Sequence, residues 1–232
     1  MKRKLVFSVI GILIILFMMV GGYKITVSRS YQLFGGLTQQ IDTEQKVVAL
    51  TFDDGPTQNV HESLPLLDKY NVKATFFLIG QDIEKYPEEA KQIVEAGHQV
   101  GNHTYSHDRM VLKSQSFISE EIEKTDELIR EAGYEGENDF RPPYGKKFVG
   151  LPYYLSKEDR ETITWNIEPD TYHTTPVDKV NYVKENIQPG SIILMHPMYA
   201  EVDKVLAEIE GVIQTLQDED YTFVTVDELQ GM

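Results

Sequence analysis

The stretch Val47-Val-Ala-Leu-Thr-Phe-Asp53-Asp54-Gly-Pro56 decides the fold class of this chain. Its first six residues are apolar or β-branched, which predicts a buried parallel strand. The following Gly-Pro pair turns the chain. Two adjacent carboxylates therefore stand at the carboxyl end of a buried strand, where α/β folds place their chemistry. The alternative is an ordinary Asp-Gly turn with an N-cap, which explains one Asp better than two.

Further strand-like runs alternate with helical patterns along the rest of the chain. The strand-like runs are Val47–Phe52, Ala74–Ile79, Gln99–Asn102, Phe140–Pro142, Thr162–Ile167, Ser191–His196 and Thr222–Val226. Apolar residues spaced by three and four predict helices at Glu88–Ala96, Phe117–Ala132, Asp178–Ile187 and Val202–Leu216.

Repeated strand–helix units predict an α/β fold with a parallel sheet and right-handed crossovers. About seven parallel strands suggest a closed or nearly closed barrel. An open doubly wound sheet is the alternative, but the sequence contains neither its Gly-rich dinucleotide fingerprint nor a phosphate loop.

The amino-terminal region differs in character from the rest. Met1-Lys-Arg-Lys precedes nineteen uncharged residues, 5–23, a length that can cross a bilayer as one transmembrane helix. A cleaved signal peptide and a secreted protein are the alternative, but no Ala-x-Ala site precedes Lys24. We expect residues 1–23 to be an uncleaved, single-pass cell-membrane anchor with the catalytic domain extracellular. Residues 24–45 are mixed and polar and predict a stalk, which leaves 46–232 as one domain.

Beyond the span the chain is strongly acidic. From Lys24 onward the chain contains all 37 Asp and Glu and 19 of the 22 Lys and Arg, so this part carries a net charge of −18. Such a balance argues against nucleic acid as a partner and is compatible with an uncharged glycan. The chain has no Cys, which excludes disulfides and thiolate zinc ligands, so any metal must be held by His and carboxylate.

Two histidines lie four residues apart in Gly101-Asn-His103-Thr-Tyr-Ser-His107. The pair alone could be two unrelated polar residues. With Asp53 and Asp54, however, it gives three ligands for one divalent metal and one carboxylate to spare. A metal-assisted hydrolase needs this inventory: three protein ligands, an open position for water and a base beside it.

Other candidate polar residues also follow predicted strands. Arg141 follows the fourth strand, Glu168 and Asp170 follow the fifth, and His196 ends the sixth. A barrel would bring these carboxyl ends to one face.

Four segments of the chain resemble four of the five motifs of the polysaccharide deacetylases, carbohydrate esterase family 4. They are Thr51-Phe-Asp-Asp-Gly-Pro56, His103-Thr-Tyr-Ser-His107, Arg141-Pro-Pro-Tyr-Gly145 and Leu194-Met-His196. The resemblance implies a distorted (β/α) barrel. It also implies removal of N-acetyl groups from chitin-like or peptidoglycan sugars with a divalent metal, usually Zn²⁺ or else another transition metal such as Co²⁺.

Position by position, the resemblance implies a role for each matching residue. Asp54, His103 and His107 would be the metal ligands. Asp53 would be the general base, with its carboxylate held by Arg141.

Across the cleft, His196 would be the general acid. The backbone N–H of Tyr144 would help to bind the oxyanion, and Leu194 would line the pocket for the acetyl methyl group.

The fourth motif departs from the family pattern and reads Trp165-Asn-Ile-Glu168-Pro-Asp170-Thr-Tyr172. We expect Asp170 to be the partner of His196 and Tyr172 to replace the aromatic wall. Trp165 is equally compatible with a core position and with a sugar platform.

The sequence therefore predicts a monomeric, membrane-anchored deacetylase of N-acetylglucosamine polymers. A catalytically silent glycan-binding relative of the same fold is the first alternative. Another metal amidohydrolase or a metal phosphoesterase is the second, although two-metal phosphoesterases need more clustered ligands than the sequence offers.

Overall fold

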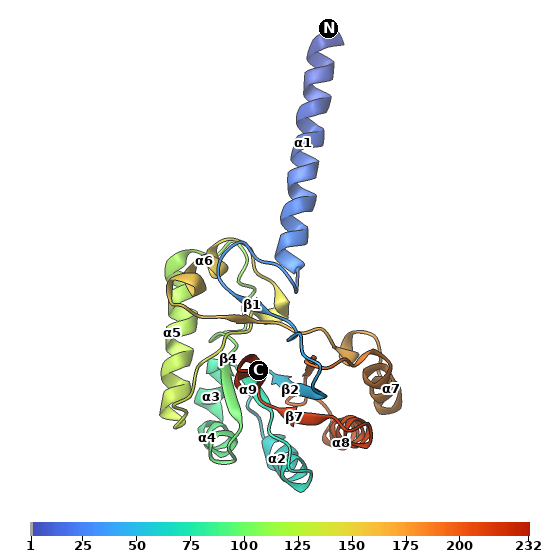
Figure 1. Cartoon of the computed structure of the whole chain (residues 1–232). Helices are drawn as coiled ribbons and strands as arrows, with labels where there is room; N and C mark the ends of the chain where they lie inside the picture. The colour runs from blue at the N-terminus through green and yellow to red at the C-terminus, as the bar shows by residue number, and fades with distance from the viewer. Residues whose placement is uncertain (1) are drawn as a thin grey trace.

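The protein, described here from a computed structural model of residues 2–232, joins one long helix to an α/β barrel (Figure 1). The strands are β1 Leu37–Thr38, β2 Val47–Asp53, β3 Thr75–Leu78, β4 Gln99–Asn102, β5 Thr162–Ile163, β6 Ile192–Met195 and β7 Thr222–Val224. The α-helices are α1 Lys2–Val27, α2 Val60–Lys69, α3 Gly80–Lys85, α4 Pro87–Glu95, α5 Gln115–Glu131, α6 Gly150–Lys157, α7 Pro176–Asn186, α8 Val202–Asp218 and α9 Val226–Gln230. Two 3₁₀ turns, η1 Pro143–Gly145 and η2 Pro169–Thr171, lie in the loops.

Strand β2 is the hub of the sheet. It pairs in parallel with β3, β6 and β7. Ala49 is opposite both Ile192 of β6 and Val224 of β7, so these two strands lie on different edges of β2. The buried, apolar β2 that the sequence predicts is thus the centre of the parallel sheet.

The barrel closes through single bridges rather than full ladders. Asn102 of β4 bridges Phe140, Phe140 bridges Thr162 of β5, and Ile167 bridges Ile193 of β6, all in parallel. The predicted strand Phe140–Pro142 is reduced to one bridge residue, because the prolines after Arg141 lack the N–H groups that a ladder needs. The predicted distorted (β/α) barrel is confirmed, with its irregular side between β4 and β6.

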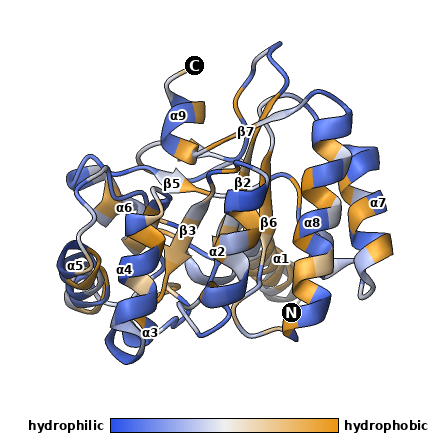
Figure 2. Cartoon of the chain, turned by 90° about the horizontal axis from the view of Figure 1, so that it is seen from below, coloured by the Kyte–Doolittle hydropathy of each residue, from blue (hydrophilic) through white to orange (hydrophobic). Residues whose placement is uncertain are grey.

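Side chains alternate between the inside and the outside of the barrel. Along β2, Val47 and Ala49 belong to the inner apolar cluster, whereas Val48, Leu50 and Phe52 pack against the surrounding helices. The same period of two holds on β6, where residues 192 and 194 face inward and residues 193 and 195 outward. The helices that cover the sheet turn their apolar sides to its outer surface and their polar sides to solvent (Figure 2).

The segment expected to be a stalk, 24–45, packs against the barrel instead. Helix α1 continues to Val27, and β1 pairs in parallel with β5. The Thr164 N–H donates to the carbonyl of Thr38 at 2.7 Å, and the Arg29 guanidinium pairs with Glu168. A two-residue strand has too short a pattern to be read from sequence, so this packing was not predicted.

Helix α1 contains a 22-residue apolar stretch, Val6–Val27, with a mean hydropathy of 2.5, and its most apolar 18 residues contain no buried residue. By length and composition it can cross a membrane, as the sequence predicts, although a signal sequence has the same character.

Candidate metal centre and active site

Two adjacent carboxylates reach the same site because the strand ends between them. Asp53 continues the inward series of β2 after Val47, Ala49 and Thr51. Asp54 would face outward if the strand continued. Its φ of 74° takes it out of the strand conformation, and its carboxylate comes to lie beside His103 and His107.

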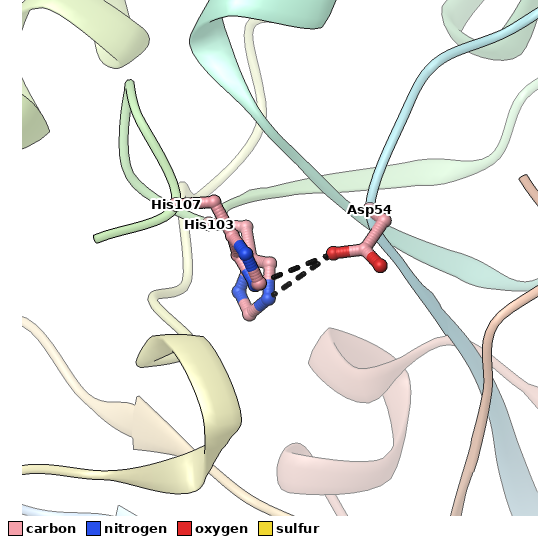
Figure 3. Close-up of side chains that lie close together, drawn as sticks. All are labelled: Asp54, His103 and His107. Carbon is pink, nitrogen blue, oxygen red and sulfur yellow. Dashed lines mark ion pairs between the residues drawn. The ribbon is translucent and has the colours of Figure 1, made fainter. Parts of the chain in front are cut away.

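Asp54, His103 and His107 form a compact donor set, with one ligand atom from each lying within 4.8 Å of the others. Asp54 Oδ1 is 3.8 Å from His103 Nε2 and 3.4 Å from His107 Nε2. Figure 3 shows the two imidazoles side by side with the carboxylate facing them. Donors on a tetrahedral zinc with bonds of about 2.0–2.1 Å lie roughly 3.4 Å apart, so a small inward movement would complete such a site.

An orphaned polar atom supports this assignment of ligands. Asp54 Oδ1 is buried and has no hydrogen-bond donor among the described residues. A buried carboxylate oxygen without a partner is costly unless something else satisfies it. A divalent ion held by Asp54, His103 and His107 would do so.

The histidines have their Nε2 atoms available for a metal. Nδ1 of His103 lies 2.7 Å from the carbonyl oxygen of Arg141, which requires Nδ1 to carry the proton and leaves the Nε2 lone pair free. Burial, together with the nearby His103, lowers the pKa of His107. Both effects favour the neutral imidazole that binds metals.

Asp53 is oriented by a buried arginine, and its Oδ2 lies 3.6 Å from His103 Nε2. Arg141, which is fully buried, donates to Asp53 Oδ1 at 2.6 Å and to Thr51 Oγ1 at 2.8 Å. Burial alone raises the pKa of Asp53, but the charges of Arg141, His103 and His196 outweigh it and hold this pKa below its ordinary value. Asp53 is therefore an ionised carboxylate whose Oδ2 is left free of Arg141.

His196 faces the site from the end of β6 and is oriented by Asp170. Its ring Nδ1 lies 2.9 Å from Asp170 Oδ2, and its backbone N–H donates to the same oxygen. Lys179 contacts the other Asp170 oxygen at 2.8 Å and Glu208 at 2.9 Å. Burial lowers the pKa of His196, but the hydrogen bond to Asp170 and the charges of Asp53 and Asp54 raise it to about 9. Its imidazolium form is thus stabilised at neutral pH.

Left-handed backbone is concentrated at this site. Asp54, His107 and Tyr144 have φ values of 74°, 57° and 59°. Such conformations cost on the order of 1–3 kcal/mol each for residues other than glycine. Surrounding packing has to hold them, which is typical of sites where side-chain direction matters more than local stability.

The remaining residues expected at the substrate lie in different environments. The Tyr144 ring is exposed and lies 4.7 Å from the ring of His107, and Tyr172 is exposed beside Tyr182. Leu194 is buried in the inner cluster.

The environment of Trp165 rules out its interpretation as a sugar platform and supports the core position. Trp165 is 3% exposed, and the centroid of its ring lies 4.6 Å from the guanidinium carbon of Arg29 and 5.5 Å from that of Arg141. A ring covered in this way packs the core and cannot stack on a sugar.

Three supporting residues were missed by sequence reasoning: Thr51, Lys179 and Glu208. Thr51 is the first residue of the Asp-Asp motif, and that position is a sequence signal for a supporting role. Its hydroxyl accepts a hydrogen bond from Arg141. Lys179 and Glu208 lie on α7 and α8 and have no local signal, because only the packing of these helices brings them to Asp170.

Comparison with known proteins agrees with this geometry. The sequence profile of a family described as polysaccharide deacetylase matches residues 40–157. A peptidoglycan-N-acetylglucosamine deacetylase of Bacillus cereus is 38% identical over 152 residues, which cover 64% of this chain and 55% of the relative. The chain thus spans about half the length of that relative.

Two solved structures extend the likeness to the fold. One is the Bc1960 peptidoglycan N-acetylglucosamine deacetylase in complex with 4-naphthalen-1-yl-N-oxidanyl-benzamide. It is 31% identical with a TM-score of 0.77, and the match covers 82% of this chain and 91% of that one. The other, BA3943, is a CE4 family pseudoenzyme from Bacillus anthracis. It is 29% identical with a TM-score of 0.74, over 82% of this chain and 67% of that one.

Proposed function

Because the chain belongs to the polysaccharide deacetylase family, we propose that it is a metal-dependent hydrolase that removes N-acetyl groups from N-acetylglucosamine-containing glycan. The expected substrates are peptidoglycan and chitin-like oligomers. The observation that carries this proposal is the Asp54–His103–His107 cluster beside an Arg141-held Asp53.

The proposed metal is Zn²⁺ or another divalent transition ion such as Co²⁺. Two neutral imidazoles and one carboxylate are donors that suit these ions, and the chain has no thiolate to offer. When bound, such an ion polarises the amide carbonyl and makes water more acidic.

Asp53 acts as the general base in this proposal. Its Oδ1 is occupied by Arg141, so Oδ2 accepts the proton of the attacking water. Arg141 keeps the carboxylate ionised and fixes its direction. The two adjacent carboxylates thus divide two tasks that one group cannot perform together.

His196 acts as the general acid. Its Nδ1 is engaged by Asp170, so Nε2 carries the proton that moves to the departing amine nitrogen. The amide C–N bond breaks as this N–H bond forms, which releases acetate and a free amino sugar. The hydrogen bond to Asp170 raises the pKa of His196 and favours the protonated ring at neutral pH.

Three further groups are proposed to contact the substrate. The Tyr144 N–H binds the oxyanion, Leu194 forms the floor for the acetyl methyl group, and Tyr172 lines the sugar side. Trp165 does not contact the substrate in this proposal and supports the site by packing against Arg141.

The proposed location is the outer face of a membrane, with α1 as an uncleaved anchor and the domain working as a monomer. Support comes from the apolar stretch Val6–Val27 and from the basic residues that precede it.

A second candidate function is a silent relative that binds glycan without hydrolysing it, since one structural neighbour is a pseudoenzyme. The gathering of Asp53, Asp54, His103, Arg141 and His196 in one site argues for an active enzyme.

Acetate release from a panel of acetylated glycans tests both candidates. The panel is chitin oligomers, peptidoglycan, and peptidoglycan whose N-acetylglucosamine has been deacetylated beforehand. We expect release with added Zn²⁺ and none after chelation. Glycan binding without acetate release, in the presence of Zn²⁺ and of Co²⁺, would establish the silent relative instead.

A further inference from the structure

Two distant segments of the chain meet where α1 enters the domain. Gly22 of α1 faces the ring of Phe148, which would lie 3.7 Å from a Cβ at that position. The Lys147 N–H donates to the carbonyl of Thr26 at 3.0 Å. The Phe34 and Tyr153 rings pack edge to face, with centroids 5.6 Å apart. The last turns of α1 are therefore fixed to the loop that leads into α6.

The junction is surrounded by exposed apolar side chains, which we name the helix-exit surface. Its members are Tyr31, Leu33, Phe34, Val149 and Tyr153, each between 38% and 54% exposed. Figure 1 shows α6 and β1 at the end of the domain from which α1 projects, with α2 and α4 at the opposite end. Phe34 and Tyr153 are in contact, and the other three lie near them in sequence on the same two segments. Exposed apolar side chains gathered in this way mark an interaction site.

Charge distinguishes this end of the domain from the rest. The chain has 37 Asp and Glu, yet none lies in 24–41 or in 140–157, the two segments that meet here. Lys24 and Lys157 are exposed within them. Phosphate-rich surfaces repel carboxylates and attract such basic groups. The same two segments carry all five members of the helix-exit surface.

The depth of the junction fits a bilayer boundary. A hydrocarbon core of about 30 Å is crossed by roughly 20 helical residues at 1.5 Å each. A span beginning at residue 5 then ends near Lys24, so Phe148, beside Gly22, lies at the edge of the core. Aromatic side chains, above all Trp and Tyr, are enriched at this level on both faces of the membrane.

We propose that the helix-exit surface rests in the headgroup layer of the outer leaflet, so that the domain is docked on the bilayer instead of swinging from α1. This inference rests on the membrane anchoring proposed above. The occupant is the lipid surface, since both segments that carry the patch contact or continue the transmembrane helix and contain no acidic residue. The segment 140–157 also carries Tyr144 of the proposed active site, four residues before Phe148. Docking therefore holds the active site near the membrane surface, within reach of glycan there.

The absence of Cys allows each position to be probed with one introduced label. Tyr31→Cys, Val149→Cys and Tyr153→Cys are each labelled with an environment-sensitive fluorophore in the full chain. The chain is then reconstituted in phosphatidylethanolamine–phosphatidylglycerol vesicles containing doxyl-labelled lipid. Asp68→Cys, exposed on α2 at the opposite end, is the matched control. Three probe positions guard against one variant failing to fold, since Tyr153 packs on Phe34.

We expect at least about twofold quenching at residues 31, 149 and 153 and none at residue 68, as for side chains in the interfacial layer. Unquenched probes in a chain that floats with the vesicles would overturn docking while leaving the anchor intact. Label–label contacts that rise with protein density would mean that a second copy covers the surface, which also overturns docking. A chain that leaves the vesicles would overturn anchoring and docking together. Acetate release in solution is a separate readout, so its loss would count against the proposed function and not against docking.

Discussion

Buried carboxyl groups at the two ends of the barrel have opposite character. At the carboxyl ends of the strands, Asp53 has its pKa held down by Arg141 at 2.6 Å. At the amino ends, burial and the charge of Asp227 raise the pKa of Asp139 to about 7. Burial and the charges of Glu137 and Glu228 raise the pKa of Asp227 to about 6. Gln99 donates its amide N–H groups to both of these carboxyls.

The difference shows what keeps a buried carboxylate charged. A neutral amide such as Gln99 satisfies hydrogen bonds but supplies no positive charge, so protonation is favoured at the amino end. A buried guanidinium supplies that charge and keeps the group ionised at the carboxyl end. The site proposed for catalysis therefore depends on Arg141 as much as on its acids.

The largest effect is expected for Asp53→Asn. The amide is nearly isosteric and accepts a hydrogen bond from Arg141, but it cannot take a proton from water. We expect deacetylation to fall on the order of 10²–10⁴-fold, and the free energy of unfolding to fall by up to about 3–5 kcal/mol, because Arg141 is left buried without its counter-charge. Steady-state acetate release is the measurement, with exposed Asp68→Asn as the control. An Asp53→Asn enzyme with ordinary activity would remove Asp53 from the base role.

The next effect is on stability. Arg141→Met removes the counter-charge and leaves Asp53 buried and unpaired, which costs about 3–5 kcal/mol of unfolding free energy at neutral pH. Denaturant unfolding measures this loss. Arg141→Met in an Asp53→Asn background should cost clearly less, because no buried charge is stranded. Equal costs in both backgrounds would show that Arg141 acts by packing alone.

Much of this contrast could be predicted from the sequence, but not all of it. The apolar run before Asp53, the four-residue histidine spacing and the strand-end position of His196 located the carboxyl-end site. The contact of Asp170 with His196 was expected from the altered fourth motif and is present at 2.9 Å. These signals are local, so a short window of residues contains them.

The features that were missed depend on packing between distant segments. Arg29 reaches Trp165 and Glu168 across more than a hundred residues of sequence, and Lys179 links two helices to Asp170. The Asp139–Asp227 pair has no sequence motif either. Asp227 lies on α9 and Asp139 lies before Phe140, and the two meet at Gln99 of β4. The hydrophobic periodicity of the sequence does not predict contacts between such distant residues.

The third prediction concerns the amino end. Because the folded-state pKa of Asp139 lies above its ordinary value of 3.8, this group stabilises the fold fully at low pH, and the contribution is lost as pH rises through about 7. Asp139→Asn mimics the neutral acid. It should be more stable than the unmodified protein at pH 8 by on the order of 2–4 kcal/mol, with little difference at pH 4. Unfolding curves across this range decide the matter, and parallel curves for the two proteins would contradict the proposed protonation.

The smallest effect is expected for Asp170→Asn. His196 remains in place but loses the carboxylate that raises its pKa to about 9. The imidazolium then deprotonates at lower pH, so the alkaline limit of deacetylation should move downward by roughly one unit or more, with about a tenfold loss of rate at pH 8. A complete pH–rate profile measures this. A reduced rate with an unmoved alkaline limit would mean that Asp170 only positions the loop.

Metal binding by the two neighbouring carboxylate variants tests the central claim most directly, that Asp54 binds the ion while Asp53 does not. Zn²⁺ titration of Asp53→Asn and Asp54→Asn should be carried out side by side with the unmodified protein. We predict that Asp53→Asn still binds one equivalent with affinity within a few-fold of the original, whereas Asp54→Asn loses at least about tenfold, since an anionic ligand is gone. Equal retention or equal loss of the ion in the two variants would contradict the division of tasks between these adjacent residues.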